Sequence, residues 1–173
     1  MFWLVESRIC PAEYKGFKHE LGDGETFETE FIGASEEDCQ KWGRENSVKA
    51  NVVNPALIAI ADARTAKDQT LLIQLYHSPG LLTPEDMLSW PEIGEIPPSD
   101  KENTWWSYRV SFKDAPEAIL ALGPEGIDEN DFPYYGLKDR LTDENGVFNV
   151  VKAGRIALGE DYEAVLSEDS KAS

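Results

Sequence analysis

The sequence is poor in the side chains that build disulfide frameworks and metal sites, with two cysteines and two histidines among 173 residues. Cys10 and Cys39 are too few for a disulfide framework, so we expect both thiols to be reduced, as is usual in the cytoplasm. His19 and His77 lie far apart, and none of the close ligand spacings of zinc modules occurs. We therefore predict a cytoplasmic protein without a metal site.

Long apolar runs and positive charge are also scarce. No segment approaches the roughly 20 apolar residues of a membrane span, and residues 1–8 lack the basic start and apolar length that a signal peptide needs. The chain has 33 acidic against 16 basic residues, for a net charge of −17. Such a charge repels nucleic-acid phosphates and anionic lipids. We expect neither partner, and favour a protein partner or a small, cationic ligand; the oligomeric state stays open.

The motifs of nucleotide binding and of common hydrolases are missing. The chain contains neither Gly-x-x-x-x-Gly-Lys-Ser/Thr nor Gly-x-Gly-x-x-Gly, and it has no Gly-x-Ser-x-Gly elbow. The acidic turn near Gly146 fails as a calcium loop because Leu141 and Lys152 fall at its first and last ligand positions. No cofactor is predicted.

The most informative stretch is residues 56–76, where two apolar runs of strand length flank a short polar break. This pattern favours a β-hairpin, and the unbroken apolar run before Asp62 is typical of a strand that is covered on both faces. We therefore expect the hairpin at the centre of a mostly antiparallel sheet.

The rest of the chain mixes strands and helices without a regular alternation or an internal repeat. The sequence predicts a single α+β domain over residues 1–166, with short helices packed on the sheet faces and a flexible tail at 167–173. Ser35 and Asp38 have the spacing of a capping box at a helix start. The other predicted elements are strands at 2–9, 27–32, 104–112 and 147–151, and helices at 35–46, 84–90, 114–121, 133–141 and within 155–166.

Several short motifs over residues 54–150, taken in order, resemble a family of small soluble domains that is known only as a domain of unknown function. They are Ala61-Asp62-Ala63-Arg64-Thr65, the strand at 70–75, Tyr108-Arg109-Val110, Asp131-Phe132 and Asp143-Glu144-Asn145-Gly146-Val147-Phe148. The first third of the chain departs from that pattern through a long polar insertion after the first strand. The resemblance implies a shared α+β core with an aspartate after the central strand, and no activity.

Asp62 and His77 are the candidate acid–base residues. Asp62 continues a face occupied by isoleucines, and Arg64 points the same way. The two form either an ordinary ion pair or turn contact at the solvent-exposed end of the strand, or a polar pair that lines a pocket. His77 is either a surface histidine or a general base that Asp62 or Asp86 orients. Spacing alone does not decide between these alternatives.

Aromatic residues give the candidate binding site. Trp105 and Trp106 point to opposite faces of one strand, and Trp105 shares its face with Arg109. An exposed tryptophan beside an arginine is typical of a binding hot spot, unless a helix covers that face too. Tyr134 is expected in the same region, and carboxylates around such an aromatic wall suit a cationic or sugar-like ligand.

Two functions follow from these residues. The first is a non-catalytic interaction or ligand-binding domain that uses Arg64 together with Trp105, Trp106, Arg109 and Tyr134. The second is a cofactor-independent enzyme for a small molecule, with acid–base chemistry in a pocket near Asp62 and His77. The sequence shows no recognisable nucleophile–base pair, which favours the interaction domain.

Overall fold

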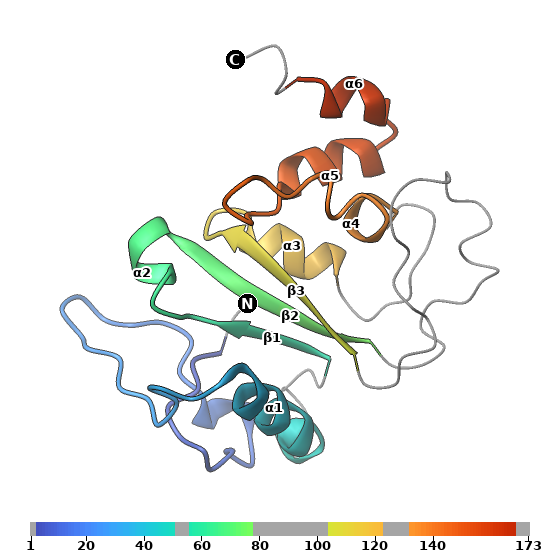
Figure 1. The fold of residues 1–173 in the computed structure, drawn as a ribbon. Helices are drawn as coiled ribbons and strands as arrows, with labels where there is room; N and C mark the ends of the chain where they lie inside the picture. The colour runs from blue at the N-terminus through green and yellow to red at the C-terminus, as the bar shows by residue number, and fades with distance from the viewer. Residues whose placement is uncertain (1–2, 51–55, 78–103, 123–131, 169–173) are drawn as a thin grey trace. The chain divides into compact units, whose positions relative to one another are not determined.

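The computed structural model describes residues 3–50, 56–77, 104–122 and 132–168 (Figure 1). The chain groups into two compact units, which we call unit 1 (residues 1–60) and unit 2 (residues 61–173) and describe separately. The fold class is α+β, as predicted, with antiparallel strands and several short helices. The single domain over residues 1–166 stays a prediction, and residues 169–173 of the predicted tail lie outside the described residues.

Unit 1 contains the 3-10 helix η1 (Tyr14–Gly16), the helix α1 (Glu36–Ala50) and the strand β1 (Leu57–Ile60). The predicted capping box is confirmed: the Ser35 amide donates to Asp38 Oδ2 and the Asp38 amide donates to Ser35 Oγ, both at 3.2 Å. These bonds use amides that a helix start otherwise leaves unpaired. The helix continues past Gly43, where a Cβ atom would lie 3.0 Å from Ile58 Cγ2. Glycine therefore lets β1 approach α1 closely.

The N-terminal part of unit 1 has little regular structure, so the predicted strands at 2–9 and 27–32 are wrong. Backbone pairing occurs only at single points in this described part: the Leu4 amide donates to the Lys18 carbonyl at 2.7 Å, and the Glu30 amide donates to the Glu6 carbonyl at 2.9 Å. Acidic and polar side chains supply further links, described below. Alternation of apolar residues without a matching neighbour is not sufficient for a regular strand.

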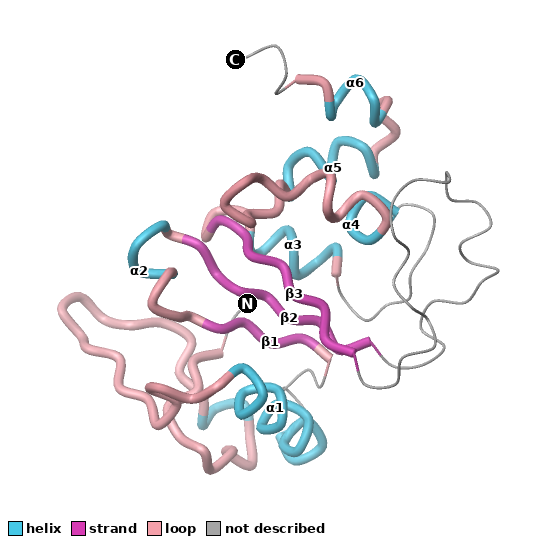
Figure 2. The backbone as a smooth tube through the Cα atoms, in the orientation of Figure 1, coloured by secondary structure: helices cyan, strands magenta, loops and turns pink. Residues whose placement is uncertain are grey.

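Unit 2 is built on two antiparallel strands, β2 (Thr70–His77) and β3 (Thr104–Ser111), coloured magenta in Figure 2. Ile73 lies opposite Tyr108, and Leu75 opposite Trp106. The side chains of Ile73, Leu75 and Tyr108 are buried, so this face forms the core, as the alternation predicts.

The described residues of unit 2 also form the short helices α2 (Thr65–Asp68), α3 (Ala115–Ala121), α4 (Phe132–Tyr135), α5 (Val150–Ala157) and α6 (Tyr162–Leu166). Helix α3 contacts both β2 and β3. Its Ala115, Ala118 and Leu122 are fully buried, at the i, i+3, i+7 spacing of one helix face. Small side chains at two of these positions allow a close approach of the helix to the strands.

Unit 2 departs from the sequence prediction in several of its connections and helices. The polar break within residues 56–76 contains the helical turn α2, which ends at Gln69 with φ of 58°. The strand predicted at 147–151 is wrong because the Asn149 side chain accepts the Lys152 amide at 3.0 Å and starts α5. The helix predicted from Pro133 ends after Tyr135.

The small helix predicted within 155–166 is present as α6, and Gly159, whose φ is +96°, lies between it and α5. Arg155 connects the two helices, because its guanidinium donates to the Glu160 and Glu168 carboxylates. Val165 of α6 is buried beside this polar connection.

Candidate functional site

Asp62 holds the first turn of α2. Its Oδ1 accepts the backbone amides of Arg64 and Thr65, both at 3.0 Å, and the Thr65 hydroxyl at 3.2 Å. An aspartate that follows a strand commonly accepts such bonds from the next amides in the chain. Asp62 therefore has a clear structural role.

The ion-pair partner of Asp62 is Arg109 of β3 and not Arg64, which makes the predicted turn contact with Asp62 through its backbone amide instead. One Arg109 nitrogen donates to Asp62 Oδ1 at 3.2 Å, and the other donates to Oδ2. The first nitrogen also donates to the Thr70 hydroxyl at 3.2 Å. The Arg109 side chain is 10% exposed and that of Asp62 36%. This forked geometry is the strong form of an arginine–carboxylate contact.

Arg64 has different partners. Its Nε donates to Asp68 Oδ2 at 2.7 Å, and its terminal nitrogen donates to the Asn145 carbonyl at 2.9 Å. Asp68 also accepts the Thr70 hydroxyl. We refer to the connected side chains Asp62, Arg64, Asp68, Thr70 and Arg109 as the Asp62 network. Because each cation in this network binds a carboxylate and a further polar group, neither is a simple surface charge.

The Asp62 network determines the charge state of its carboxylates. Partial burial acts to raise the pKa of Asp62, but the hydrogen bonds from Arg109 and from the Thr65 amide outweigh it and lower the pKa to about 2. Hydrogen bonds from Thr70 and Arg64 also lower the pKa of Asp68. Asp62 is therefore ionised at neutral pH. A carboxylate with so low a pKa is a weak proton acceptor.

His77 lies at the other end of β2. It is opposite Thr104 in the strand register, whereas Arg109, which binds Asp62, is opposite Leu72. Five residues of strand, at about 3.3 Å each, separate these positions by about 16 Å. The structure thus does not bring the backbone of His77 to the Asp62 network. The His77 side chain and the whole of Asp86 lie outside the described residues.

Aromatic side chains lie at the same strand end as His77. Trp105 is opposite Tyr76, and their ring centroids are 5.3 Å apart. Trp106, on the other face, has its ring 5.3 Å from Tyr135 and 5.7 Å from the Lys138 ammonium. Tyr76 and both tryptophans are partly exposed. We refer to Tyr76, Trp105 and Trp106 as the strand-end aromatic patch.

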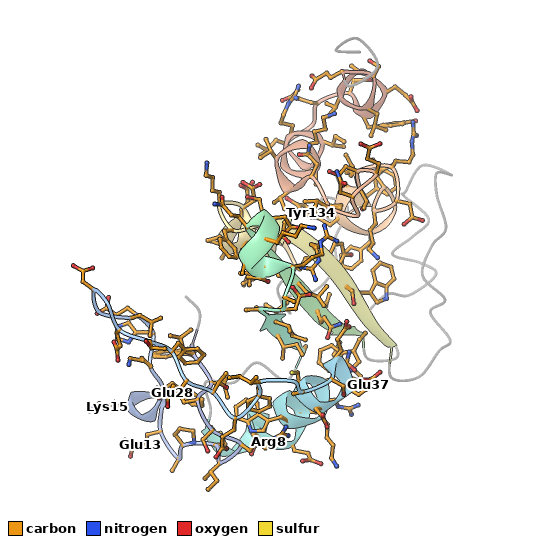
Figure 3. The ribbon with its side chains drawn as sticks, turned by 60° about the vertical axis from the view of Figure 1, so that its left-hand side comes forward. Arg8, Glu13, Lys15, Glu28, Glu37 and Tyr134 are labelled. Atoms are coloured by element: carbon orange, nitrogen blue, oxygen red, sulfur yellow. The ribbon has the colours of Figure 1, made fainter. Side chains whose placement is uncertain are left out.

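Tyr134 lies in the core of unit 2, beside β3 (Figure 3). Its side chain is 5% exposed, its ring centroid lies 6.1 Å from that of Phe148, and its backbone carbonyl accepts the Tyr108 hydroxyl at 3.0 Å. Burial raises the pKa of Tyr108 well above its usual value. The structure therefore places the Tyr134 side chain among packed rings, where it is buried.

Comparison with known proteins gives no relative from which a role can be transferred. No family model, curated protein or solved structure matches the chain. Among the described residues, no group of three or more His, Cys, Asp or Glu side chains could hold a metal ion. Within the same part of the chain, no helix is long and apolar enough to cross a membrane.

Sequence reasoning selected Asp62, Arg64 and Arg109 but missed the members that connect them. Thr70 and Asp68 are joined to Arg109 and Arg64 through side-chain hydrogen bonds. The only available signal was the Arg64/Asp68 spacing of four residues, which suits a helical ion pair. The contact of Asp62 with Arg109 spans 47 residues and depends on the strand register, which no local pattern reveals.

Proposed function

We propose that this chain is a non-catalytic, cytoplasmic interaction domain that binds a protein or a small, cationic ligand through the strand-end aromatic patch. The observation that carries the proposal is that Trp105 and Trp106 keep partial exposure, whereas Tyr108 and Val110, further along the same strand, are buried. Tryptophan and tyrosine supply most of the energy at many interfaces.

The chemistry of the Asp62 network supports binding over acid–base catalysis. Both Asp62 oxygens accept hydrogen bonds, and the pKa of Asp62 is about 2. The backbone of His77 lies at the end of β2 that is far from Arg109, the partner of Asp62. A proton-transfer residue works best with a pKa near the working pH. The alternative, a cofactor-independent enzyme, has no comparable observation in its favour among the described residues.

Charge narrows the class of partner. The net charge of −17 favours cationic ligands and basic proteins and disfavours nucleic acid. A cation placed over the Trp105 or Tyr76 ring gains a further attraction from the face of the ring. The resemblance to a family of small domains adds no activity to this proposal.

The proposal is tested by affinity capture from native lysate with the wild-type chain and the Trp105→Ser variant. Bound proteins and small molecules are identified by mass spectrometry. We expect a partner that the wild type retains and Trp105→Ser loses, while Leu120→Ser, which alters an exposed leucine on α3, retains it. Equal capture by Trp105→Ser contradicts the proposal. Conversion of a captured small molecule by the wild type, abolished in Asp62→Asn, establishes the enzyme alternative.

A further inference from the structure

Three segments of unit 1 meet at Arg8. The Arg8 guanidinium carbon lies 4.9 Å from the centre of the Phe31 ring, in a cation–π arrangement. The Trp42 ring meets Phe31 edge-on, with centroids 5.7 Å apart, and the Trp42 indole N–H donates to the Arg8 carbonyl at 2.9 Å. The N-terminal segment, the loop before α1 and α1 itself thus hold one another at this point.

Glu30 fixes the two non-helical segments in register. Its Oε2 accepts the Arg8 amide at 2.6 Å and the Ser7 hydroxyl at 2.9 Å, and its own amide donates to the Glu6 carbonyl at 2.9 Å. The Arg8 amide and the Ser7 hydroxyl lower the pKa of Glu30. These bonds satisfy backbone groups as well as the Glu30 carboxylate. The segments around Arg8 are therefore held in a defined arrangement.

Two large apolar side chains are exposed at this point. Ile9 directly follows Arg8 and is 82% exposed, and Ile32 directly follows Phe31 and is 83% exposed. Single exposed apolar residues are common and need no explanation. Here, however, the two isoleucines adjoin residues that contact each other, and Phe31 and Trp42 are themselves partly exposed. We refer to Arg8, Ile9, Phe31, Ile32 and Trp42 as the Ile9/Ile32 surface.

Carboxylates predominate around the Ile9/Ile32 surface. Figure 3 shows Glu28 and Glu37 on either side of Arg8 in that view. The exposed acidic residues on the segments that form the surface outnumber its exposed cations, which are Arg8, Lys41 and Arg44. The acidic residues are Glu6, Glu28, Glu30, Glu36, Glu37, Asp38 and Glu45. A partner that covers the isoleucines therefore meets mainly negative charge.

We propose that the Ile9/Ile32 surface binds a basic segment of another protein that carries at least one large apolar side chain. The apolar side chain packs on Ile9 and Ile32, and the Lys or Arg side chains of the segment reach the surrounding carboxylates. An apolar contact combined with charge pairing at its edge is typical of protein interfaces. It is a surface of unit 1 and does not depend on the strand-end aromatic patch of unit 2.

The test is selection of short random peptides from a display library on the full chain, with counter-selection on the Ile9→Ser/Ile32→Ser variant. Both isoleucines are exposed, so we expect the variant to fold like the wild type. We expect the selected peptides to have a net positive charge and a large apolar residue. They should bind the variant about tenfold more weakly than the wild type, and they should bind more weakly as salt is raised.

Nuclear magnetic resonance places the bound peptide. The Trp42 indole N–H, which donates to Arg8, gives a single reporter signal at the surface, and we expect it to shift in a saturable manner as the selected peptide is added. Leu120→Ser, on α3 of unit 2, is the matched control and should leave the affinity unchanged.

Several outcomes overturn the inference. They are an enrichment of neutral or acidic peptides, equal affinity for the Ile9→Ser/Ile32→Ser variant, and a library that yields no saturable binder. Self-association of the wild type that the variant abolishes assigns the surface to a second copy of this chain. Loss of peptide binding in Trp105→Ser, with the Ile9→Ser/Ile32→Ser variant unaffected, assigns the peptides to the strand-end aromatic patch.

Discussion

The two units are stabilised in different ways. The core of unit 2 consists of apolar side chains from β3 and its neighbouring elements, such as Tyr108, Val110 and Phe148, all of which are buried. In the described part of unit 1, Phe17 is the only large apolar side chain that is buried. Unit 1 instead relies on hydrogen bonds between side chains and backbone, such as that from the Thr29 hydroxyl to the Val5 carbonyl. Polar contacts of this kind give a smaller net stabilisation than core packing does.

The largest effect is expected from breaking the core of unit 2. Tyr108→Ala removes a buried ring that packs on Phe148 and donates to the Tyr134 carbonyl. We expect it to lower the free energy of unfolding by about 3–5 kcal/mol, measured by urea denaturation. Phe31→Ala, at the partly exposed ring of unit 1, should cost only about 1 kcal/mol. Equal losses at the two sites contradict the difference between the units.

The Tyr108→Phe variant separates packing from hydrogen bonding at the same position. It keeps the ring and leaves the buried Tyr134 carbonyl without its donor, so we expect a loss of about 1 kcal/mol. A loss as large as that of Tyr108→Ala shows that the hydroxyl, and not the ring, dominates.

A smaller effect is expected from acid titration of Asp62. Its pKa falls from 3.8 to about 2 on folding, so its stabilisation is complete above the unfolded pKa and is lost as the pH falls through 3.8 toward about 2. Since the carboxylate is 36% exposed, we expect a loss of about 1 kcal/mol after solvent screening.

Asp62→Asn is the matched variant for this titration. It should remove the contribution of Asp62 from the pH profile of urea unfolding between about pH 5 and about pH 2. Profiles of the same steepness in the variant and the wild type show that other carboxylates account for the acid sensitivity.

The smallest effect is expected at the start of α1 in unit 1. Ser35→Ala removes the acceptor of the Asp38 amide at an exposed helix start, and we expect a loss of about 0.5 kcal/mol. Hydrogen exchange of the amides of residues 36–39 measures it locally, and Ser35→Asp, which keeps a side-chain acceptor, is the control. Faster exchange in both variants excludes the cap as the cause.

The elements that follow from local rules were predictable from the sequence. The capping box at Ser35 and Asp38 needs only neighbouring residues, and the alternation in β3 separates buried Tyr108 from Arg109 without knowledge of the partner strand. The antiparallel α+β class follows from the same patterns.

The remaining features depend on contacts between distant parts of the chain. Arg109 of β3 binds Asp62 across 47 residues of the sequence, and the chain at Phe148 pairs with Arg109 through a single backbone bond before Asn149 begins α5. Three valines and Phe148 within residues 147–151 suggested a strand, whereas Asn149 is the N-cap of α5. The sequence did not indicate the Ile9/Ile32 surface, because both isoleucines lie in segments that were predicted to be strands.

Because ion pairs of Arg155 connect α5 to α6, we expect the stability of α6 to depend on ionic strength more than that of the β2–β3 pair does. Arg155 is the common partner of Glu160 and Glu168, and dissolved ions weaken attraction between exposed charges. Added electrolyte should therefore loosen α6 while the β2–β3 pair keeps its protection. A chain cut before Glu168 would lose one of the two carboxylates that hold this last helix.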